Sequence, residues 1–159
     1  MGSPGYNRLV LVRDIMQAAP TPVTNDTSLA EAARLLASSN GTDLYLVDDA
    51  GKLIGVLTEG DVIRAILPDL AEIHRAGGSV IDAMDAFVAK GRRLAEHSIR
   101  PYVIPEPLSV APTDHAAVAA TLMTERQIRR LPVVADGHLV GAISRGDIVG
   151  RMIGAGPPA

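Results

Sequence analysis

GVLTEGD at residues 55–61 is written a second time as GAISRGD at residues 141–147, with glycine, a hydroxyl residue, glycine and aspartate at matching places. The opening glycines of the two heptapeptides are 86 residues apart, and so are their closing aspartates. A pattern that returns at one fixed spacing indicates an internal repeat. The chain is therefore predicted to contain the same structural unit twice.

The similarity continues upstream of both heptapeptides. LYLVDDAGKLIGVLTEGDVI at residues 44–63 aligns with LPVVADGHLVGAISRGDIV at residues 131–149, with one residue deleted between the apolar runs. Further upstream, PVTNDTSLAEAARLLASSN aligns with LSVAPTDHAAVAATLMTER at a spacing of 87 residues. The repeats are therefore expected to cover roughly residues 12–66 and 100–152.

Each repeat predicts the same order of elements. An extended lead, PTPV or PLSV, comes before a helix, which in the first copy has a capping box of Ser28 and Glu31 and apolar residues spaced along one face. Two β-rich runs come next, separated by DDAG or ADGH, which are typical of hairpin turns. A second helix begins at Thr58 or Ser144. The unit is therefore predicted to be β-α-β-β-α, twice.

Between the repeats, residues 67–99 are predicted to form a helical insertion. Pro68 suits the first turn of one helix, and the two glycines of HRAGG end it. A second helix is expected from Ser79, with Asp82 as its capping partner. IRPYVIP, residues 99–105, is expected to be extended, because each proline disfavours helical backbone in the residue before it. The expected apolar face of the second helix consists of Ile81, Met84, Phe87 and Val88.

Composition limits the class of protein. The chain has 159 residues, 47% of them hydrophobic, which suits a globular protein with a sizeable core. It has no cysteine and a net charge of −3, so disulfides, thiolate metal sites and a broad positive field for nucleic acid are not expected. Its apolar runs are shorter than a membrane span. We expect a cytoplasmic protein with loose tails at residues 1–11 and 153–159.

Two units that each close with Gly, two residues, Thr or Ser, two residues, Asp and an apolar helix resemble a tandem pair of CBS domains, often called a Bateman module. VRDIM at residues 12–16 and RRLPVV at residues 129–134 also resemble sequences of that family. The resemblance spans nearly the whole chain except the insertion and the tails. It implies a mixed α/β (α+β) fold in which CBS domain 1 (12–66) and CBS domain 2 (100–152) pack as a pseudo-twofold pair, with the insertion (67–99) between them.

The heptapeptides have the chemistry of a nucleoside phosphate site. Thr58 and Ser144 begin helices, where unpaired N–H groups and the helix dipole favour a phosphate. Asp61 and Asp147 each offer two acceptor oxygens for the two hydroxyls of a ribose. The glycine that opens each heptapeptide leaves room for another backbone or a flat base. The same hydroxyl and aspartate pairs also form capping boxes, so a structural role is expected with or without a ligand.

The resemblance implies adenine ligands, because pairs of this family bind AMP, ADP, ATP or S-adenosylmethionine in clefts between the two units, with the matching Thr/Ser and Asp positions in contact. It also implies that Arg130, or else Arg129, reaches the ligand phosphates, which suits a guanidinium. The alternative for both arginines is a solvated surface charge. The first repeat has Asp43 in the corresponding place, which indicates one strong site and one weak or vacant site. By analogy the adenine pockets are lined by residues for which ordinary core packing is the alternative: Val23, Thr24, Val110 and Ala111.

The chain shows no catalytic set and no metal site, since its four histidines stand far apart in the sequence. We therefore expect a stand-alone regulatory module, not an enzyme, that senses an adenine nucleotide as a regulatory ligand and requires no cofactor. A homodimer through apolar helix faces and an unknown effector protein are the expected partners, without membrane contact. One alternative is a structural interaction module without nucleotide. The other, a nucleic-acid-binding module, would use KGRR at residues 90–93 with Arg126, Arg129 and Arg130, and the net negative charge disfavours it.

Overall fold

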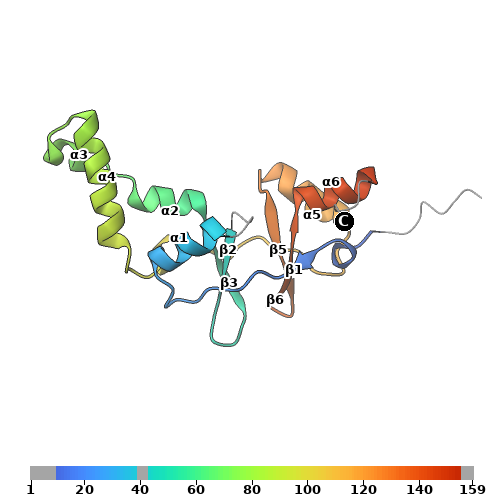
Figure 1. The fold of residues 1–159 in the computed structure, drawn as a ribbon. Coiled ribbons are helices and arrows are strands. Elements are labelled where there is room, and N and C mark those ends of the chain that lie inside the picture. Colours follow the sequence, from blue (N-terminus) through green and yellow to red (C-terminus); the bar gives the residue numbers. More distant parts are fainter. Residues whose placement is uncertain (1–9, 39–42, 155–159) are drawn as a thin grey trace, which may run out of the picture. The chain divides into compact units, whose positions relative to one another are not determined.

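The computed structural model of the chain describes residues 10–38 and 43–154. Its contacts divide the chain into two compact units. Of these residues, unit 1 comprises 10–20, 50–53 and 107–154, and unit 2 comprises 21–38, 43–49 and 54–106. Each unit has its own three-stranded sheet and its own helices (Figure 1), and each encloses its own apolar core. The predicted mixed α/β fold with two similar units is confirmed.

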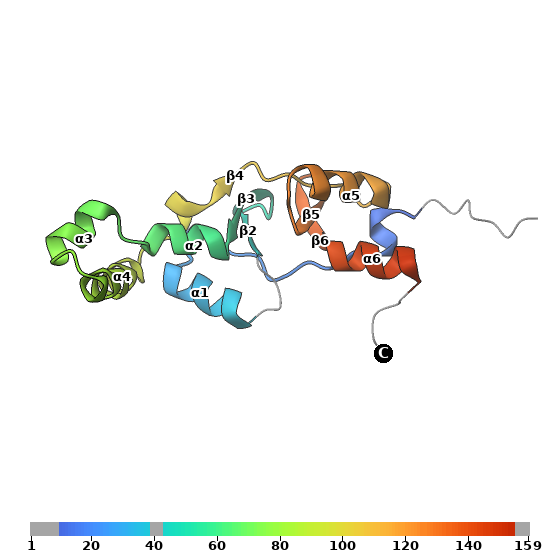
Figure 2. The same cartoon turned by 90° about the horizontal axis from the view of Figure 1, so that it is seen from above.

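Unit 1 contains a sheet of order β1-β6-β5, whose strand pairs are both antiparallel. The β5–β6 hairpin turns through Asp136 and Gly137, whose φ angles of 51° and 81° suit the type I′ turn that a two-residue hairpin loop prefers. Helices α5 and α6 pack against one another (Figure 2). The elements of this unit are η1 (Val12–Asp14), β1 (Gln17–Ala18), α5 (Ala116–Glu125), β5 (Arg130–Ala135), β6 (His138–Ser144) and α6 (Arg145–Ile153).

Unit 2 contains a sheet of order β2-β3-β4, with α1 packed against α2. Strand β3 pairs with β4 in the antiparallel direction. The elements of this unit are α1 (Leu29–Ser38), β2 (Asp43–Val47), β3 (Leu53–Thr58), α2 (Glu59–Ile66), α3 (Leu70–Ala76), α4 (Val80–Leu94), η2 (Arg100–Tyr102) and β4 (Ile104–Pro105).

The two cores are built from equivalent positions of the repeat. Leu57 in unit 2 and Ile143 in unit 1 are both fully buried, and each lies two residues after the glycine of its heptapeptide. Val12 and Ile99, near the start of the two repeats, are also fully buried, the first in the core of unit 1 and the second in the core of unit 2. Apolar side chains at matching places of the repeat therefore perform the same packing role twice.

The third strand of each sheet comes from the start of the other repeat. Strand β1 lies at the start of the first repeat but pairs with β6 of the second, where Gln17 lies opposite Ala142. Strand β4 lies at the start of the second repeat but pairs with β3 of the first, where Ile104 lies opposite Val56. Residues 12–20 therefore fold with the second repeat, and the units differ in this respect from the repeats drawn from the sequence.

The expectation of an extended IRPYVIP segment was wrong for part of its length. Arg100–Tyr102 forms a 3-10 turn, and Ile104–Pro105 is extended as β4. Pro101 fits the turn because the first positions of a helix need no hydrogen bond from the backbone nitrogen.

The beginning of α3 also differs from the expectation. Pro68 lies before the helix, and Asp69 is the N-cap, whose side chain accepts the Glu72 N–H at 2.7 Å. The glycines after the helix do end it, since Gly77 and Gly78 have positive φ angles of 128° and 85°. Aspartate therefore supplies the start signal that the sequence reading assigned to proline.

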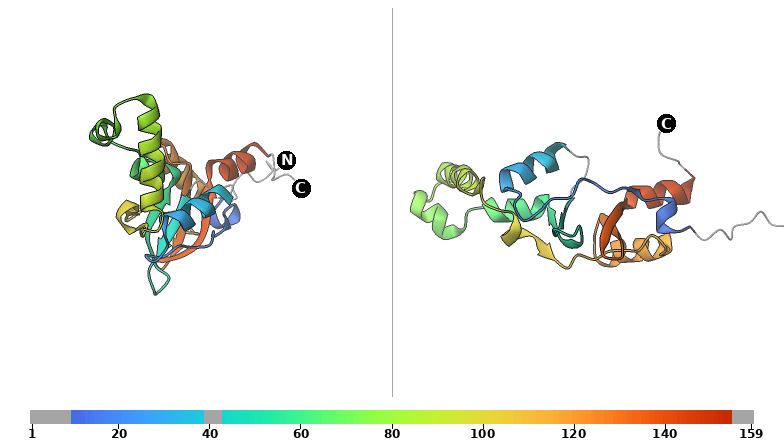
Figure 3. Two further views of the ribbon diagram at one scale, coloured as in Figure 1. Left: turned by 60° about the vertical axis from the view of Figure 1, so that its left-hand side comes forward. Right: turned by 90° about the horizontal axis from the view of Figure 1, so that it is seen from below.

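Helices α3 and α4 form the hairpin of the predicted insertion (Figure 3). Helix α4 begins with the expected capping box, in which the Ser79 hydroxyl accepts the Asp82 N–H at 3.1 Å. On the expected apolar face of α4, Ile81 is 74% and Met84 59% exposed, whereas Phe87 is half-buried. Apolar contacts therefore account for only part of what holds the hairpin together.

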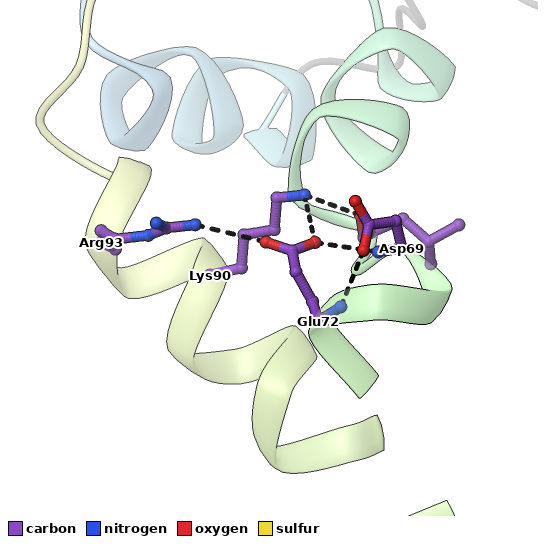
Figure 4. Close-up of polar contacts among 5 residues, drawn as sticks. Asp69, Glu72, Lys90 and Arg93 are labelled. Carbon is purple, nitrogen blue, oxygen red and sulfur yellow. Dashed lines mark hydrogen bonds and ion pairs between the residues drawn. The ribbon is translucent and has the colours of Figure 1, made fainter. Parts of the chain in front are cut away.

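A polar cluster joins α3 to α4 (Figure 4). Lys90 Nζ donates to Glu72 Oε2 at 2.8 Å and to the carbonyl oxygen of Leu67 at 3.1 Å. Arg93 Nη2 lies 3.5 Å from Glu72 Oε1, and Glu72 Oε2 also accepts the Asp69 N–H at 2.8 Å. The hydrogen bond from Lys90 is the largest cause that lowers the pKa of Glu72, and the Asp69 N–H lowers it further.

Acidification is expected to loosen the contact between α3 and α4. Because folding lowers the pKa of Glu72, the contact contributes fully above the usual glutamate pKa of 4.5 and is lost as the pH falls through the lowered value. Protection factors of the α3 and α4 amides in hydrogen exchange, measured by NMR from about pH 6 to about pH 3, check this. Lys90→Met should lower these factors at the higher pH and flatten their pH dependence, whereas the exposed Arg92→Met should not. An unchanged pH profile in Lys90→Met would count against the ion pair.

Candidate functional site

In unit 2, the heptapeptide forms a complete capping box at the start of α2. Thr58 has extended backbone with φ −108° and ψ 165°, and its hydroxyl oxygen accepts the Asp61 N–H at 3.3 Å. In return, Asp61 Oδ2 accepts the Thr58 N–H at 2.8 Å and the Thr58 hydroxyl at 2.9 Å. The Asp61 side chain is only 6% exposed. The predicted capping role of this pair is confirmed.

Unit 1 repeats this geometry at the start of α6. Ser144 has φ −109° and ψ 165°, and its hydroxyl oxygen accepts the Asp147 N–H at 3.2 Å. Asp147 Oδ2 accepts both the Ser144 N–H and the Ser144 hydroxyl at 2.7 Å. The two repeats therefore present the same hydroxyl and carboxylate in the same local arrangement.

The second oxygen of each aspartate is also bound. Asp61 Oδ1 is paired with the guanidinium of Arg64 on the next turn of α2. Asp147 Oδ1 accepts a hydrogen bond from Gln17 Nε2 at 3.1 Å. The bidentate ribose contact expected from the sequence requires both oxygens, and one of them is committed to the cap in each unit. Only Oδ1 is held by a side chain that a ligand could replace without opening the cap.

A pocket of about 340 Å³ adjoins Asp61 in unit 2, lined by Asp61, Arg64, Ala65 and Tyr102. Its volume lies at the lower end of the range of small-molecule sites. Sequence reasoning missed Arg64 and Tyr102. Arg64 lies three residues after Asp61, a spacing that puts both on one helix face and would have revealed the pair. Tyr102 carried no such signal, because its segment was expected to be extended.

The two arginines predicted for phosphate contact lie at the start of β5. Arg130 is half-buried and lies directly opposite Ser144 in the β5–β6 ladder, so both side chains stand on the same face of the sheet. It has no ion-pair partner in residues 10–38 and 43–154. Arg129 is exposed, and its carbonyl oxygen accepts the Arg145 N–H at 3.0 Å. The structure thus brings Arg130, rather than Arg129, to the side chain of the cap.

Arg145, inside the second heptapeptide, has a structural role. Its Nε donates to the carbonyl oxygen of Ile128 at 2.9 Å, and its Nη2 donates to that of Met123 at 3.0 Å. Met123 lies in the last turn of α5, where carbonyl groups lack helical partners. Arg145 therefore binds the end of α5 and is not available as a free cation beside Ser144.

The four residues assigned to adenine pockets lie beside the first β-rich run of each repeat. Val23 and Val110 are each 3% exposed and belong to the two cores, which favours the core-packing alternative for their side chains. The exposed Thr24 donates its N–H to Thr27 Oγ1 at 3.2 Å, and the half-buried Ala111 donates its N–H to a carboxylate oxygen of Asp114 at 2.8 Å. The leads that carry Val23 and Val110 form single parallel bridges with Leu46 and Val133.

The glycines of the heptapeptides admit a neighbouring backbone, one of the two options that the sequence left open. A Cβ added to Gly55 would lie 3.2 Å from the Ile104 carbonyl oxygen, and one added to Gly141 would lie 2.9 Å from that of Gln17. Each sheet therefore accepts its short third strand through a glycine.

The part of the chain that the structure describes contains no cluster of three or more side chains suited to a metal ion. None of its helices is long and apolar enough to cross a membrane.

Comparison with known proteins gives the family. Residues 12–68 and 98–154 each match the sequence pattern of the CBS domain. The uncharacterized protein MJ1426 of Methanocaldococcus jannaschii is 26% identical over 156 residues, which cover 91% of this chain and 92% of that protein. The chloroplastic CBS domain-containing protein CBSX2 of Arabidopsis thaliana is 30% identical over 135 residues, covering 80% of this chain and 56% of that protein, so this chain spans about half of its length.

Solved structures give the same result. The crystal structure of CBSX2 in complex with AMP matches with a TM-score of 0.67 and 28% identity, covering 91% of this chain and 97% of that chain. A putative acetoin utilization protein from Vibrio cholerae has a TM-score of 0.70 at 23% identity, with 92% of both chains covered, and shows the likeness of the fold. Because the two matched segments span most of the sequence, the chain belongs to the CBS domain family and carries a tandem pair of these domains.

Proposed function

We propose that this CBS pair is a regulatory module that binds an adenine nucleotide and passes its occupancy to an effector protein or to its own assembly. One observation carries the proposal: both repeats hold a hydroxyl and a carboxylate in one arrangement at a helix start, in a chain that resembles an AMP-bound relative. AMP, ADP, ATP and S-adenosylmethionine are the candidate ligands. The role is regulatory and not catalytic.

The proposed phosphate contacts lie at the N-termini of α2 and α6. Thr58 and Ser144 use their hydroxyl groups in the caps, so a phosphate would be bound mainly by the free N–H groups of the first turn and the helix dipole. Gly60 and Gly146, at the second helical position, have no side chain to block its approach. In unit 1, Arg130 adds a positive charge on the same face as Ser144.

The proposed ribose contact is the Oδ1 atom of Asp61 or Asp147. Each Oδ2 remains in its cap, and a ribose hydroxyl would replace the side chain that now donates to Oδ1. The two repeats differ at the phosphate, because unit 1 has Arg130 where the first repeat has Asp43. We therefore expect the stronger phosphate site beside Ser144. Val23, Thr24, Val110 and Ala111 remain the proposed adenine contacts.

An adenine nucleotide at a hundred times its dissociation constant is expected to stabilise the protein by about 2.7 kcal/mol, which for a chain of this size raises Tm by several degrees. Thermal unfolding against AMP, ADP, ATP, S-adenosylmethionine and GTP measures this. Asp147→Asn keeps acceptor and cap but loses the charge, and should weaken ligand binding by about 1 to 3 kcal/mol, roughly 5- to 150-fold. Asp85→Asn, an exposed aspartate of α4, is the matched control and should bind like the wild type.

The absence of stabilisation by any adenine ligand, in a folded protein, would reject the nucleotide proposal. The two heptapeptides would then be helix caps alone, and a structural interaction module would take its place. Binding of nucleic acid whose affinity falls strongly with rising salt would favour the nucleic-acid-binding module.

We propose that the assembly is a homodimer formed through apolar helix faces. The last helix of each repeat leaves equivalent positions open: Ile63 of α2 is 53% and Val149 of α6 is 54% exposed, and Leu67 and Ile153 follow at 54% and 76%. Exposed apolar side chains at a helical spacing are typical of contact surfaces. Light scattering should give twice the chain mass, and Val149→Glu should give the mass of one chain. A single-chain mass for the wild type would contradict the dimer.

A further inference from the structure

The carboxylate of Asp61 is fully engaged inside unit 2. Its Oδ2 accepts two hydrogen bonds from Thr58, and its Oδ1 is paired with Arg64. The aspartate is 6% exposed whereas Arg64 is 70% exposed. A carboxylate withdrawn from water needs a partner for each oxygen. Arg64 therefore pairs with Oδ1, the Asp61 oxygen that takes no part in the cap, and does so from a solvent-exposed position.

The second repeat satisfies the equivalent oxygen by a different route. Gly150 stands three residues after Asp147, where the first repeat has Arg64, so α6 offers no such cation. Instead, the neutral amide of Gln17 on β1 donates to Asp147 Oδ1. The residue of β4 that corresponds to Gln17 is Ile104, whose side chain donates no hydrogen bond. Only the first repeat therefore uses a positive charge at this place.

Arg64 lies where its pairing with Asp61 affects ligand binding. Arg64 lines the pocket of about 340 Å³ together with Asp61 and Tyr102. A ribose hydroxyl that donates to Asp61 Oδ1 must take the place of the guanidinium. Arg64 is 70% exposed and stays hydrated when it leaves, and the ribose hydroxyl takes its place at the buried Oδ1, so the exchange of donors costs little. The freed guanidinium would remain beside the pocket as a positive charge.

We infer that Arg64 is a specificity-determining residue of the first repeat. It competes with the ribose for Asp61, which weakens binding, and it compensates for this loss only when the ligand carries a phosphate that the guanidinium can bind. The inference rests on the proposed adenine-nucleotide function. An uncharged nucleoside must displace Arg64 and gains nothing from its charge. A nucleotide displaces it and then attracts the released guanidinium to its phosphate. The first repeat therefore discriminates AMP from adenosine through Arg64, whereas the second repeat lacks this device at Asp147.

Site-resolved NMR titration of the full chain with adenosine and with AMP tests the inference. The backbone amides of Gly60 and Asp61 report the first repeat, and those of Gly146 and Asp147 report the second. In Arg64→Met the adenosine affinity reported by Gly60 should rise about two- to fivefold, the equivalent of up to about 1 kcal/mol for the lost competition with Arg64. AMP affinity at the same amide should stay level or fall, so that the preference for AMP decreases. Arg64→Gln keeps a neutral donor and should show the same loss of preference with a smaller gain for adenosine.

Arg75→Met, at an exposed arginine of α3, is the matched control and should leave both affinities unchanged. An unchanged or weaker adenosine affinity in Arg64→Met, in a protein whose Gly60 amide responds to adenosine, would overturn the competition while leaving the proposed function in place. Failure of adenosine, AMP, ADP, ATP and S-adenosylmethionine alike to shift any of the four amides would overturn the proposed function and this inference with it.

Discussion

Leu57→Ala and Ile143→Ala are each expected to lower the free energy of unfolding by about 2 to 5 kcal/mol. The two residues occupy equivalent positions of the repeat and both are fully buried, one in each core. Truncation removes apolar surface from each core and leaves a cavity that the surrounding β-strands can close only in part. Similar losses at both positions would show that the repeats rely equally on this residue.

Urea denaturation followed by circular dichroism measures the two losses. Ile143→Val, which removes a single methyl group, should cost only about 0.5 to 1.5 kcal/mol. Leu70→Ala, at a leucine of α3 that is 78% exposed, is the control and should stay within about 0.5 kcal/mol of the wild type. A loss below about 1 kcal/mol for either alanine variant would contradict the packing described for that core.

Gly55→Ala and Gly141→Ala are expected to destabilise the protein by about 1 to 3 kcal/mol, the cost of forcing atoms into a filled space. At Gly141 the new methyl group would lie 2.9 Å from the Gln17 carbonyl oxygen and 2.8 Å from Met16 Sδ. At Gly55 it would overlap Val103 Cγ1 and approach the Ile104 carbonyl oxygen. A backbone oxygen cannot rotate away, so the short third strand must shift in each sheet.

Thermal unfolding measures the loss, and the amide signals of β1 and β4 should shift in the respective variants. Gly146→Ala is the matched control within the second heptapeptide, since the nearest atom to its new methyl group would be Ser144 Oγ at an ordinary 3.6 Å. Replacement of a helical glycine by alanine there should stabilise the protein by up to about 1 kcal/mol. Equal stability of Gly141→Ala and Gly146→Ala would contradict the close approach of β1.

Signals that act over a few residues were visible in the sequence. The hydroxyl and aspartate of each heptapeptide predicted the start of α2 and α6, because a cap joins residues only three positions apart. The dipeptide at residues 136–137 predicted the β5–β6 turn for the same reason. The repeat itself predicted two units, since equal sequences bury equal faces. These features required no knowledge of distant contacts.

Contacts between distant residues were not visible. Gln17 reaches Asp147 across 130 positions of the chain, and β1 is too short to carry a periodic pattern. Tyr102 lines the pocket because its segment turns where the prolines predicted an extended chain. The apolar side of α4 was predicted, but the exposure of Ile81 and Met84 on it was not, since a helical pattern shows which side is apolar and not what covers it.

The exchange of β1 and β4 has a consequence for aggregation. In unit 2, β3 lies between β2 and β4, so its backbone groups are covered on both sides. A fragment cut at the repeat boundaries, residues 12–66, would retain β3 and lose β4. Strand β3 would then become an exposed edge, with Gly55 and Val56 offering unpaired N–H and C=O groups to any other chain. A single repeat expressed alone is therefore expected to aggregate through β3. The insertion between the repeats connects β3 to β4 in one chain, so that β4 can cover this edge.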